Sequence, residues 1–447
     1  MEKKFNEMCE VARRCYSIDQ QMYPKYNVKR GLRNADGTGV LVGLTRIGDV
    51  HGYTIEDNDR LPDEGVLRYR GINVKEIIEN CEQENRHGFE EVCYLLLFGK
   101  LPTKKQLEGF NEVIGEYRAL PEGFTEDMIL KAPSQDIMNK IARSVLAAYS
   151  YDNDPDSTTL ENMIRQSIEL IARIPTMAAY AYQAKAHYFE NKSLFIHTPQ
   201  KGLSTAENLL YMMRPDNKFT DLEADVLDTS LILHAEHGGG NNSAFTAHVV
   251  SSSGTDTYSA IAAAIGSLKG PKHGGANNRV RGMIEDFKAN ISDISDRDMV
   301  RDYIAKTLKG QNFDGSGLVY GMGHAIYTLS DPRAVMLKKQ ARELAEEKGY
   351  EKLFGLYNLI EELTPEVFAE IKGVNKPLCA NVDLYSGLVY EMLDIPPVLF
   401  TPIFAISRMA GWCAHRIEEV IAGGRIIRPA YKSVETKMPY TTLNERE

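Results

Sequence analysis

The sequence predicts a mostly α-helical protein with a few short strands near its N-terminus. Residues 40–72 combine glycines, β-branched residues and turn signals such as Asp63-Glu64-Gly65, which is typical of short strands or extended hairpins. After residue 72 the helical signals dominate. At 447 residues the chain is longer than one ordinary domain, so we expect two domains or one large elaborated domain.

Composition narrows the class of protein. Hydrophobic residues make up 43% and charged residues 26% of the chain, and we expect no apolar run of the roughly 18 to 20 residues that a membrane span needs. The first residues lack the apolar core of a signal peptide, and the six cysteines form no CxxC pair. We therefore expect a soluble, cytoplasmic protein with free thiols. The net charge of -10 argues against non-specific nucleic-acid binding, so isolated arginines must supply the charge for any anionic ligand.

Capping signals and apolar spacing predict where helices begin and end. Residues 103–106 carry a capping-box pattern, and Thr364-Pro365-Glu366 is expected to open a helix as N-cap, N1 and N2. Residues 260–265 are apolar all round, which predicts a buried helix that ends near Gly270-Pro271.

Histidines stand out in two places. His234 and His237 would share one face of a helix, which permits a metal pair, but the HExxH spacing is absent and no third ligand is obvious. We therefore favour a hydrogen-bonding or core role for both and expect no metal. His273 follows a Gly-Pro break and precedes two glycines, so rigid structure would present it where other groups approach closely. A satisfied interior histidine is the alternative.

A further histidine, His324, lies in a glycine-bearing segment. Gly321 and Gly323 match the start of a GxGxxG loop, but Ile326 fills the third glycine position and no Walker lysine follows. A helix start comes next, with Arg333 in the first turn, where a cation opposes the helix dipole at a cost of about 0.3 to 1 kcal/mol. This departure indicates a carboxylate or phosphate site, and an exposed arginine that extends away is the alternative.

Charged residues near the C-terminus have unusual neighbours. Asp383 could simply be the N-cap of the next helix. Arg408 lies in VLFTPIFAISRMAGWCA, which is apolar on nearly every face, so its guanidinium needs an anionic partner that the local sequence does not offer. Arg425 and Arg428 follow beside glycine and proline, in a tail that could reach a second subunit.

Together, HAEH-G, GPKHGGAN, GMGHAIY followed by DPR, NVDLYSG and FAISR-MAGW-AH, in this order and at these separations, resemble the citrate synthase family. The resemblance runs from about residue 40 to the C-terminus. It implies an almost all-α homodimer in which residues 1–273 and 389–447 form a large domain and residues 274–388 a small one. The active site would lie between the two domains, which would close on the substrate.

The same resemblance assigns the chemistry. Asp383 would be the base that deprotonates acetyl-CoA, His273 the donor to the thioester oxygen of the enol, and His324 the donor to the carbonyl of oxaloacetate. Hydrolysis of citryl-CoA would then give citrate and CoA, the entry step of the tricarboxylic acid cycle. The implied carboxylate-binding residues are His237, Arg333, Arg408 and, from the neighbouring subunit, Arg428. The implied CoA-binding residues are Val319, Gly321 and Gly323.

Two alternatives remain open at this point. A 2-methylcitrate synthase performs the same condensation with propionyl-CoA and shares these motifs, because one methylene in an acyl pocket is worth only about 1 to 3 kcal/mol. A non-catalytic helical dimer that binds dicarboxylates is the alternative from another class. In each case we expect no permanently bound cofactor, no metal, no nucleic acid and no membrane.

Overall fold

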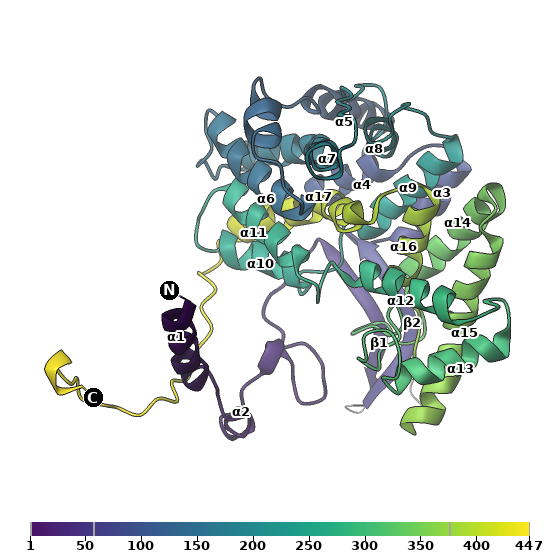
Figure 1. Ribbon diagram of the computed structural model, residues 1–447. Helices are drawn as coiled ribbons and strands as arrows, with labels where there is room; N and C mark the ends of the chain where they lie inside the picture. The colour runs from purple at the N-terminus through teal and green to yellow at the C-terminus, as the bar shows by residue number, and fades with distance from the viewer. Residues whose placement is uncertain (1, 57–58, 375–376, 447) are drawn as a thin grey trace. The chain divides into compact units, whose positions relative to one another are not determined.

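The computed structural model describes residues 2–56, 59–374 and 377–446, and helices make up most of it (Figure 1). Its elements in chain order are α1 (Glu2–Cys15), α2 (Met22–Lys25), η1 (Arg30–Leu32), β1 (Gly48–Glu56), β2 (Asp59–Tyr69), β3 (Ile72–Asn73), α3 (Val74–Gln83), α4 (Phe89–Phe98), α5 (Lys104–Tyr117), η2 (Thr125–Leu130), α6 (Ile137–Ala148), η3 (Tyr149–Tyr151), α7 (Leu160–Glu190), α8 (Thr205–Met213), α9 (Asp221–His234), α10 (Asn242–Ser251), α11 (Thr257–Lys269), α12 (Ala276–Asn290), α13 (Arg297–Leu308), α14 (Pro332–Lys348), α15 (Glu351–Lys372), α16 (Val382–Met392), η4 (Pro397–Leu399), α17 (Phe400–Ile421) and η5 (Leu443–Glu445). The predicted mostly helical fold, with its strands near the N-terminus, is confirmed.

The chain separates into two compact units, Met1–Leu44 and Thr45–Glu447. The first contains only α1, α2 and η1, and the second contains every other element. Within the second unit, α12 to α16 pack largely on one another, while α12 also contacts α17 and α14 also contacts α9. The expected division of the chain at residues 273 and 388 stays a prediction.

Helix α17 is the centre of the second unit (Figure 1). Every residue from Phe400 to Arg416 is buried, against α4, α7, α9, α10 and α11. In the described part of the chain, Pro397–Ile421 is the stretch that is long and apolar enough to cross a membrane, which the sequence analysis did not expect. However, 89% of its most apolar window is buried inside the protein, as in a core helix.

The sheet has the order β1-β2-β3 and is antiparallel throughout. The turn expected at residues 63–65 is wrong, because these residues lie within β2. Gly65 is required there for a different reason: a Cβ would stand 2.1 Å from the carbonyl oxygen of Ser330. The Gly65 N–H also donates to the Ser330 hydroxyl at 3.1 Å, so β2 holds the segment that leads into α14.

Helix ends follow the sequence in some places and depart from it in others. The capping box of Thr103 and Gln106 is confirmed, and α11 ends at Lys269 directly before Gly270. The helix start expected at Thr364 is wrong, because Pro365 lies inside α15. Neighbouring α15 residues are buried on both sides of this proline, so tertiary packing outweighs the lost backbone hydrogen bond.

Candidate active site

Arg408 is a fully buried cation on α17. Its Nε donates to the carbonyl oxygen of His234 at 2.6 Å, and its Cζ lies 4.8 Å from the centre of the Phe404 ring. Its two terminal nitrogens have no hydrogen-bond partner within the described residues. Burial lowers the pKa of Arg408 to about 10, which still leaves it charged at neutral pH. A buried guanidinium with two unpartnered nitrogens is suited to binding a carboxylate.

His237, in the segment after α9, lies beside His324. The two ring centres are 5.3 Å apart, and the His324 ring stacks on Tyr327 with centres 4.6 Å apart. Burial, together with the charges of Arg333 and Arg408, holds the pKa of His237 well below its usual range, so the ring is neutral. Its buried Nε2 has no hydrogen-bond partner in the described part of the chain, and it joins the two terminal nitrogens of Arg408 as a third polar atom of the site that lacks a partner.

The backbone fixes the tautomer of His324. Its Nδ1 accepts the N–H groups of Ile326 and Tyr327, each at 3.1 Å. An atom that accepts two hydrogen bonds carries no proton, so the proton of the neutral ring is on Nε2. His324 therefore presents Nε2 as a hydrogen-bond donor.

Arg333 is buried, with 4% of its surface exposed, so the alternative of an exposed arginine is wrong. Its Nε and Nη2 donate to the two carboxylate oxygens of Asp331 at 3.0 and 2.8 Å. Asp331 is also the N-cap of α14, where it accepts the backbone N–H of Arg333. The carboxylate at the helix N-terminus offsets the unfavourable position of the arginine relative to the helix dipole. From the sequence, Asp331 is expected only to form part of the helix start that precedes Arg333.

Asp383 is the second residue of α16 and is not its N-cap. Asn381 is the N-cap, and its side chain accepts the N–H of Asp383 at 3.0 Å, so the capping alternative is wrong. Burial raises the pKa of Asp383 to about 6, Asp331 adds to this shift, and Arg333 opposes it. Such a carboxyl group can gain and lose a proton close to neutral pH.

The loop that contains Val319, Gly321 and Gly323 is joined to the start of α16. Gly323 N–H donates to the carbonyl oxygen of Cys379 at 2.7 Å, and Asn381 N–H donates to that of Gly321 at 2.8 Å. A Cβ on Gly321 would lie 2.9 Å from Cβ of Leu384 and 3.0 Å from its Cα. Glycine is therefore needed for this contact, which places the predicted CoA loop beside Asp383.

His273 lies in the turn after α11 and is half-buried. Its Nε2 is 3.0 Å from the hydroxyl of Ser243, which also accepts the indole N–H of Trp412 at 3.1 Å. Burial and the charge of Arg408 lower the pKa of His273 to about 4, so the ring is neutral. Ser243 could not be identified from the sequence as a partner of His273, because it lies 30 residues away in the chain.

The structure thus groups most of the predicted residues. His237 and His324 are in ring contact, Arg333 influences the pKa of both His237 and Asp383, and Arg408 influences that of His273. His234 has the hydrogen-bonding role expected for it, because its Nδ1 donates to the carbonyl oxygen of Ser230 at 2.8 Å. Arg428 is exposed in the segment after α17, and its place in a neighbouring subunit stays a prediction.

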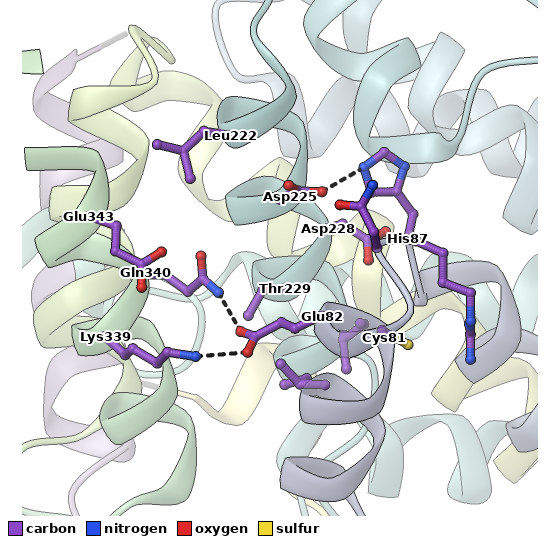
Figure 2. A pocket seen from close by; sticks show the side chains of 14 residues that line it. Cys81, Glu82, His87, Leu222, Asp225, Asp228, Thr229, Lys339, Gln340 and Glu343 are labelled. Carbon is purple, nitrogen blue, oxygen red and sulfur yellow. Dashed lines mark hydrogen bonds and ion pairs between the residues drawn. The ribbon is translucent and has the colours of Figure 1, made fainter. Parts of the chain in front are cut away.

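A cavity of about 280 Å³ lies apart from these residues, between α3, α9 and α14 (Figure 2). On one side Glu82 accepts hydrogen bonds from Lys339 and Gln340, each at 2.7 Å. On the other, His87 pairs with Asp225 at 3.1 Å. None of the candidate site residues lines this cavity, so it is a separate feature.

We predict that Asp331→Ala lowers the free energy of unfolding by about 3 to 5 kcal/mol, because it leaves the guanidinium of Arg333 buried without its partner. The matched control is Asp296→Ala, which removes a side chain that caps α13 through two backbone N–H groups. Loss of a cap alone costs about 1 kcal/mol. Urea unfolding of both variants measures the difference, and equal losses would contradict the importance of the Arg333 pair.

Known proteins resemble this chain over most of its length. The family profile described as "Citrate synthase, C-terminal domain" matches residues 35–430. A citrate synthase from Synechocystis is 34% identical over 86% of this chain and 89% of its own length. A 2-methylcitrate synthase from Corynebacterium glutamicum is also 34% identical, over 84% of this chain and 92% of its own.

A solved structure of a citrate synthase from Thermoplasma acidophilum, in a ternary complex with carboxymethyl coenzyme A and oxaloacetate, has a similar fold. Its TM-score is 0.75 at 27% identity, and the match covers 94% of this chain and 99% of that one. The sequence motifs, the helical fold and these matches over nearly the whole chain agree. The chain therefore belongs to the citrate synthase family.

Proposed function

We propose that this protein is a citrate synthase, which condenses acetyl-CoA with oxaloacetate and hydrolyses citryl-CoA to citrate and CoA. The observation that carries the proposal is that three buried nitrogens of the site, both terminal nitrogens of Arg408 and Nε2 of His237, lack hydrogen-bond partners within the described residues. Buried donors without partners are costly, so a ligand with carboxylate oxygens that fills this place is strongly favoured. Oxaloacetate has two carboxylates and a ketone, and the related Thermoplasma structure contains it.

The proposed reaction begins with loss of a proton from the methyl group of acetyl-CoA to the carboxylate of Asp383. His273 stabilises the resulting enolate by a hydrogen bond to the thioester oxygen. Since the pKa of His273 is lowered to about 4, it acts as a neutral donor. The nitrogen of His273 that donates to the thioester oxygen is then Nδ1. This arrangement requires that Nε2 of His273 accepts a hydrogen bond from the Ser243 hydroxyl.

Carbon–carbon bond formation follows at the ketone of oxaloacetate. The enolate carbon attacks the carbonyl carbon, the carbonyl oxygen takes the proton of Nε2 of His324, and the proton that Asp383 gained from acetyl-CoA returns to His324. The two backbone N–H groups on Nδ1 keep this donor in place before substrate arrives, which is a form of preorganised stabilisation. Water then attacks the thioester carbonyl of citryl-CoA, the carbon–sulfur bond breaks, and CoA leaves as its thiol.

We further propose a homodimer in which Arg428 of one subunit completes the carboxylate site of the other. Its exposure in this single chain supports a contact outside it. The loop with Val319, Gly321 and Gly323 is proposed to receive CoA, since it adjoins the helix that carries Asp383. Closure of the site around both substrates would exclude water from the enol.

A 2-methylcitrate synthase is the second candidate function. Relatives of that name match this chain at the same identity as relatives named citrate synthase. The two activities differ by one methylene in the acyl group, which no motif in the chain distinguishes.

We predict that Asp383→Asn lowers kcat by about 100- to 10,000-fold while oxaloacetate binding, measured by calorimetry, stays within a few-fold of wild type. In the wild type, kcat/KM for acetyl-CoA should fall about tenfold per pH unit below pH 6, because a carboxyl whose pKa is raised to about 6 is protonated there and cannot act as a base. The control is Asp394→Asn, whose side chain is 78% exposed. Near-normal condensation by Asp383→Asn would exclude it as the base.

Mixing two inactive variants tests the shared site. Arg428→Ala and Asp383→Asn homodimers should each have strongly reduced activity, whereas coexpressed subunits should recover about a quarter of the wild-type activity. Half of randomly formed dimers are mixed, and one of their two sites has both intact residues. Mixed dimers without recovered activity would place Arg428 in the site of its own subunit or outside it.

The acyl group is identified by comparing kcat/KM for acetyl-CoA and propionyl-CoA on the same preparation. We predict a preference for acetyl-CoA of about 10-fold or more, as expected where an acyl pocket excludes one methylene. A propionyl-CoA preference of that size would instead establish the 2-methylcitrate activity.

A further inference from the structure

His248, His415 and Glu418 form a cluster that the proposed reaction does not use. His248 lies on α10, and the other two residues lie on α17. One ligand atom from each residue lies within 4.8 Å of the others. Among the described residues, this is the one group of three or more His, Cys, Asp or Glu side chains that is placed to hold a metal ion.

Two carboxylates determine where the histidine protons are. Nε2 of His415 is 2.9 Å from Oε1 of Glu236, and Nδ1 of His248 is 2.8 Å from Oε2 of Glu419. A carboxylate accepts hydrogen bonds, so each of these outer nitrogens carries a proton. If both rings are neutral, the inner nitrogens, Nε2 of His248 and Nδ1 of His415, point lone pairs at each other across 3.0 Å. Lone pairs repel at this distance, so a positive centre, either a proton or a metal ion, must lie between them.

The third residue favours a metal ion over a proton. Oε2 of Glu418 is buried without a hydrogen-bond partner within the described residues, and it lies 3.8 Å from Nδ1 of His415, too far for a hydrogen bond. With one shared proton the three carboxylates and two imidazoles would keep a net charge of about -2, and this oxygen would still lack a partner. A divalent ion would lower the net charge to about -1 and would coordinate that oxygen.

We propose that Nε2 of His248, Nδ1 of His415 and Oε2 of Glu418 bind one divalent transition-metal ion, with water as the fourth ligand and Zn²⁺ as the best match to this donor set. Tetrahedral Zn²⁺ places its nitrogen and oxygen ligands about 3.3 to 3.4 Å apart. Two of the three observed separations, 3.0 and 3.8 Å, lie on either side of this value, and the third, between His248 and Glu418, is within 4.8 Å. The side-chain carboxylate of Glu418 must move by on the order of 1 Å to complete a tetrahedral site.

The surroundings also fit a metal site. Each histidine donates its outer N–H to a carboxylate, the usual way in which proteins orient metal-binding histidines. The cluster has access to solvent, since the His248 and Glu418 side chains are 12% and 18% exposed. A Cβ on Gly239 would be in van der Waals contact with both rings, 3.5 Å from Nε2 of His248 and 3.8 Å from Nδ1 of His415, so the lack of a side chain at Gly239 leaves space beside these nitrogens.

The ion would link α10 to α17 beside the oxaloacetate residues. Glu236, which orients His415, directly precedes His237 and accepts the backbone N–H of Gly238. We therefore assign the ion a structural role, in contrast to the metal-free protein that the sequence led us to expect. The proposal is independent of the proposed reaction, which uses none of the three ligands.

Metal binding can be measured on the full-length protein without an affinity tag. Metals are first removed with a chelator. In equilibrium dialysis against Zn²⁺ we then expect the protein to bind one Zn²⁺ per chain, and added Co²⁺ should give the intense visible absorption of a tetrahedral site. His248→Gln and Glu418→Gln should abolish both signals. Glu419→Gln, which removes only the partner of His248, should weaken Zn²⁺ binding by about 10- to 100-fold.

The matched control is His187→Gln, at an exposed histidine at the end of α7 that hydrogen-bonds to a backbone carbonyl. It should leave the stoichiometry and the Co²⁺ spectrum unchanged. Absence of retained metal in the wild type, or unchanged binding in both His248→Gln and Glu418→Gln, would overturn the proposal. So would a nitrogen-15 NMR spectrum of the zinc-treated protein that shows a proton on Nδ1 of His415.

Discussion

The charge of Arg408, held in a stretch of α17 whose residues are all buried, is the constraint on which the site depends. Removing a guanidinium from water costs several kcal/mol, and among the described residues Arg408 has one hydrogen bond, the face of a phenylalanine ring and the favourable charge of Glu236. The same charge has a second effect, because with burial it lowers the pKa values of His237 and His273. The residue that attracts an anion therefore also keeps its histidine neighbours neutral.

Most of the remaining organisation consists of groups that hold protons or side chains in one arrangement. Backbone N–H groups set the tautomer of His324, Asp331 aligns the guanidinium of Arg333, and Ser243 contacts the ring of His273. Each holds its neighbour in place before any ligand binds, so little reorganisation is needed during a reaction. The free energy needed to order these groups is therefore part of the free energy of folding, and it is not required again when a substrate binds.

The sequence predicted the helical fold and the position of the strands, because the turn-rich segment and the capped apolar segments are local signals. It also predicted that Arg408 is buried, since its neighbours along α17 are apolar. The turn at residues 63–65 and the helix start at Thr364 were wrong because tertiary packing outweighed local preference. The Asp331 partner could have been read from its spacing to Arg333. Ser243 could not, because a fold must form before residues 30 apart can meet.

The pairing of the glycine loop with the start of α16 has a consequence for how this protein can change. Gly321 and Gly323 are hydrogen-bonded to residues 379–381, and Gly321 fits closely against Leu384, the residue after Asp383. A substitution that reshapes the loop therefore shifts the aspartate as well. Variation at Gly321 therefore cannot change the shape of the loop without also disturbing the position of the proposed base.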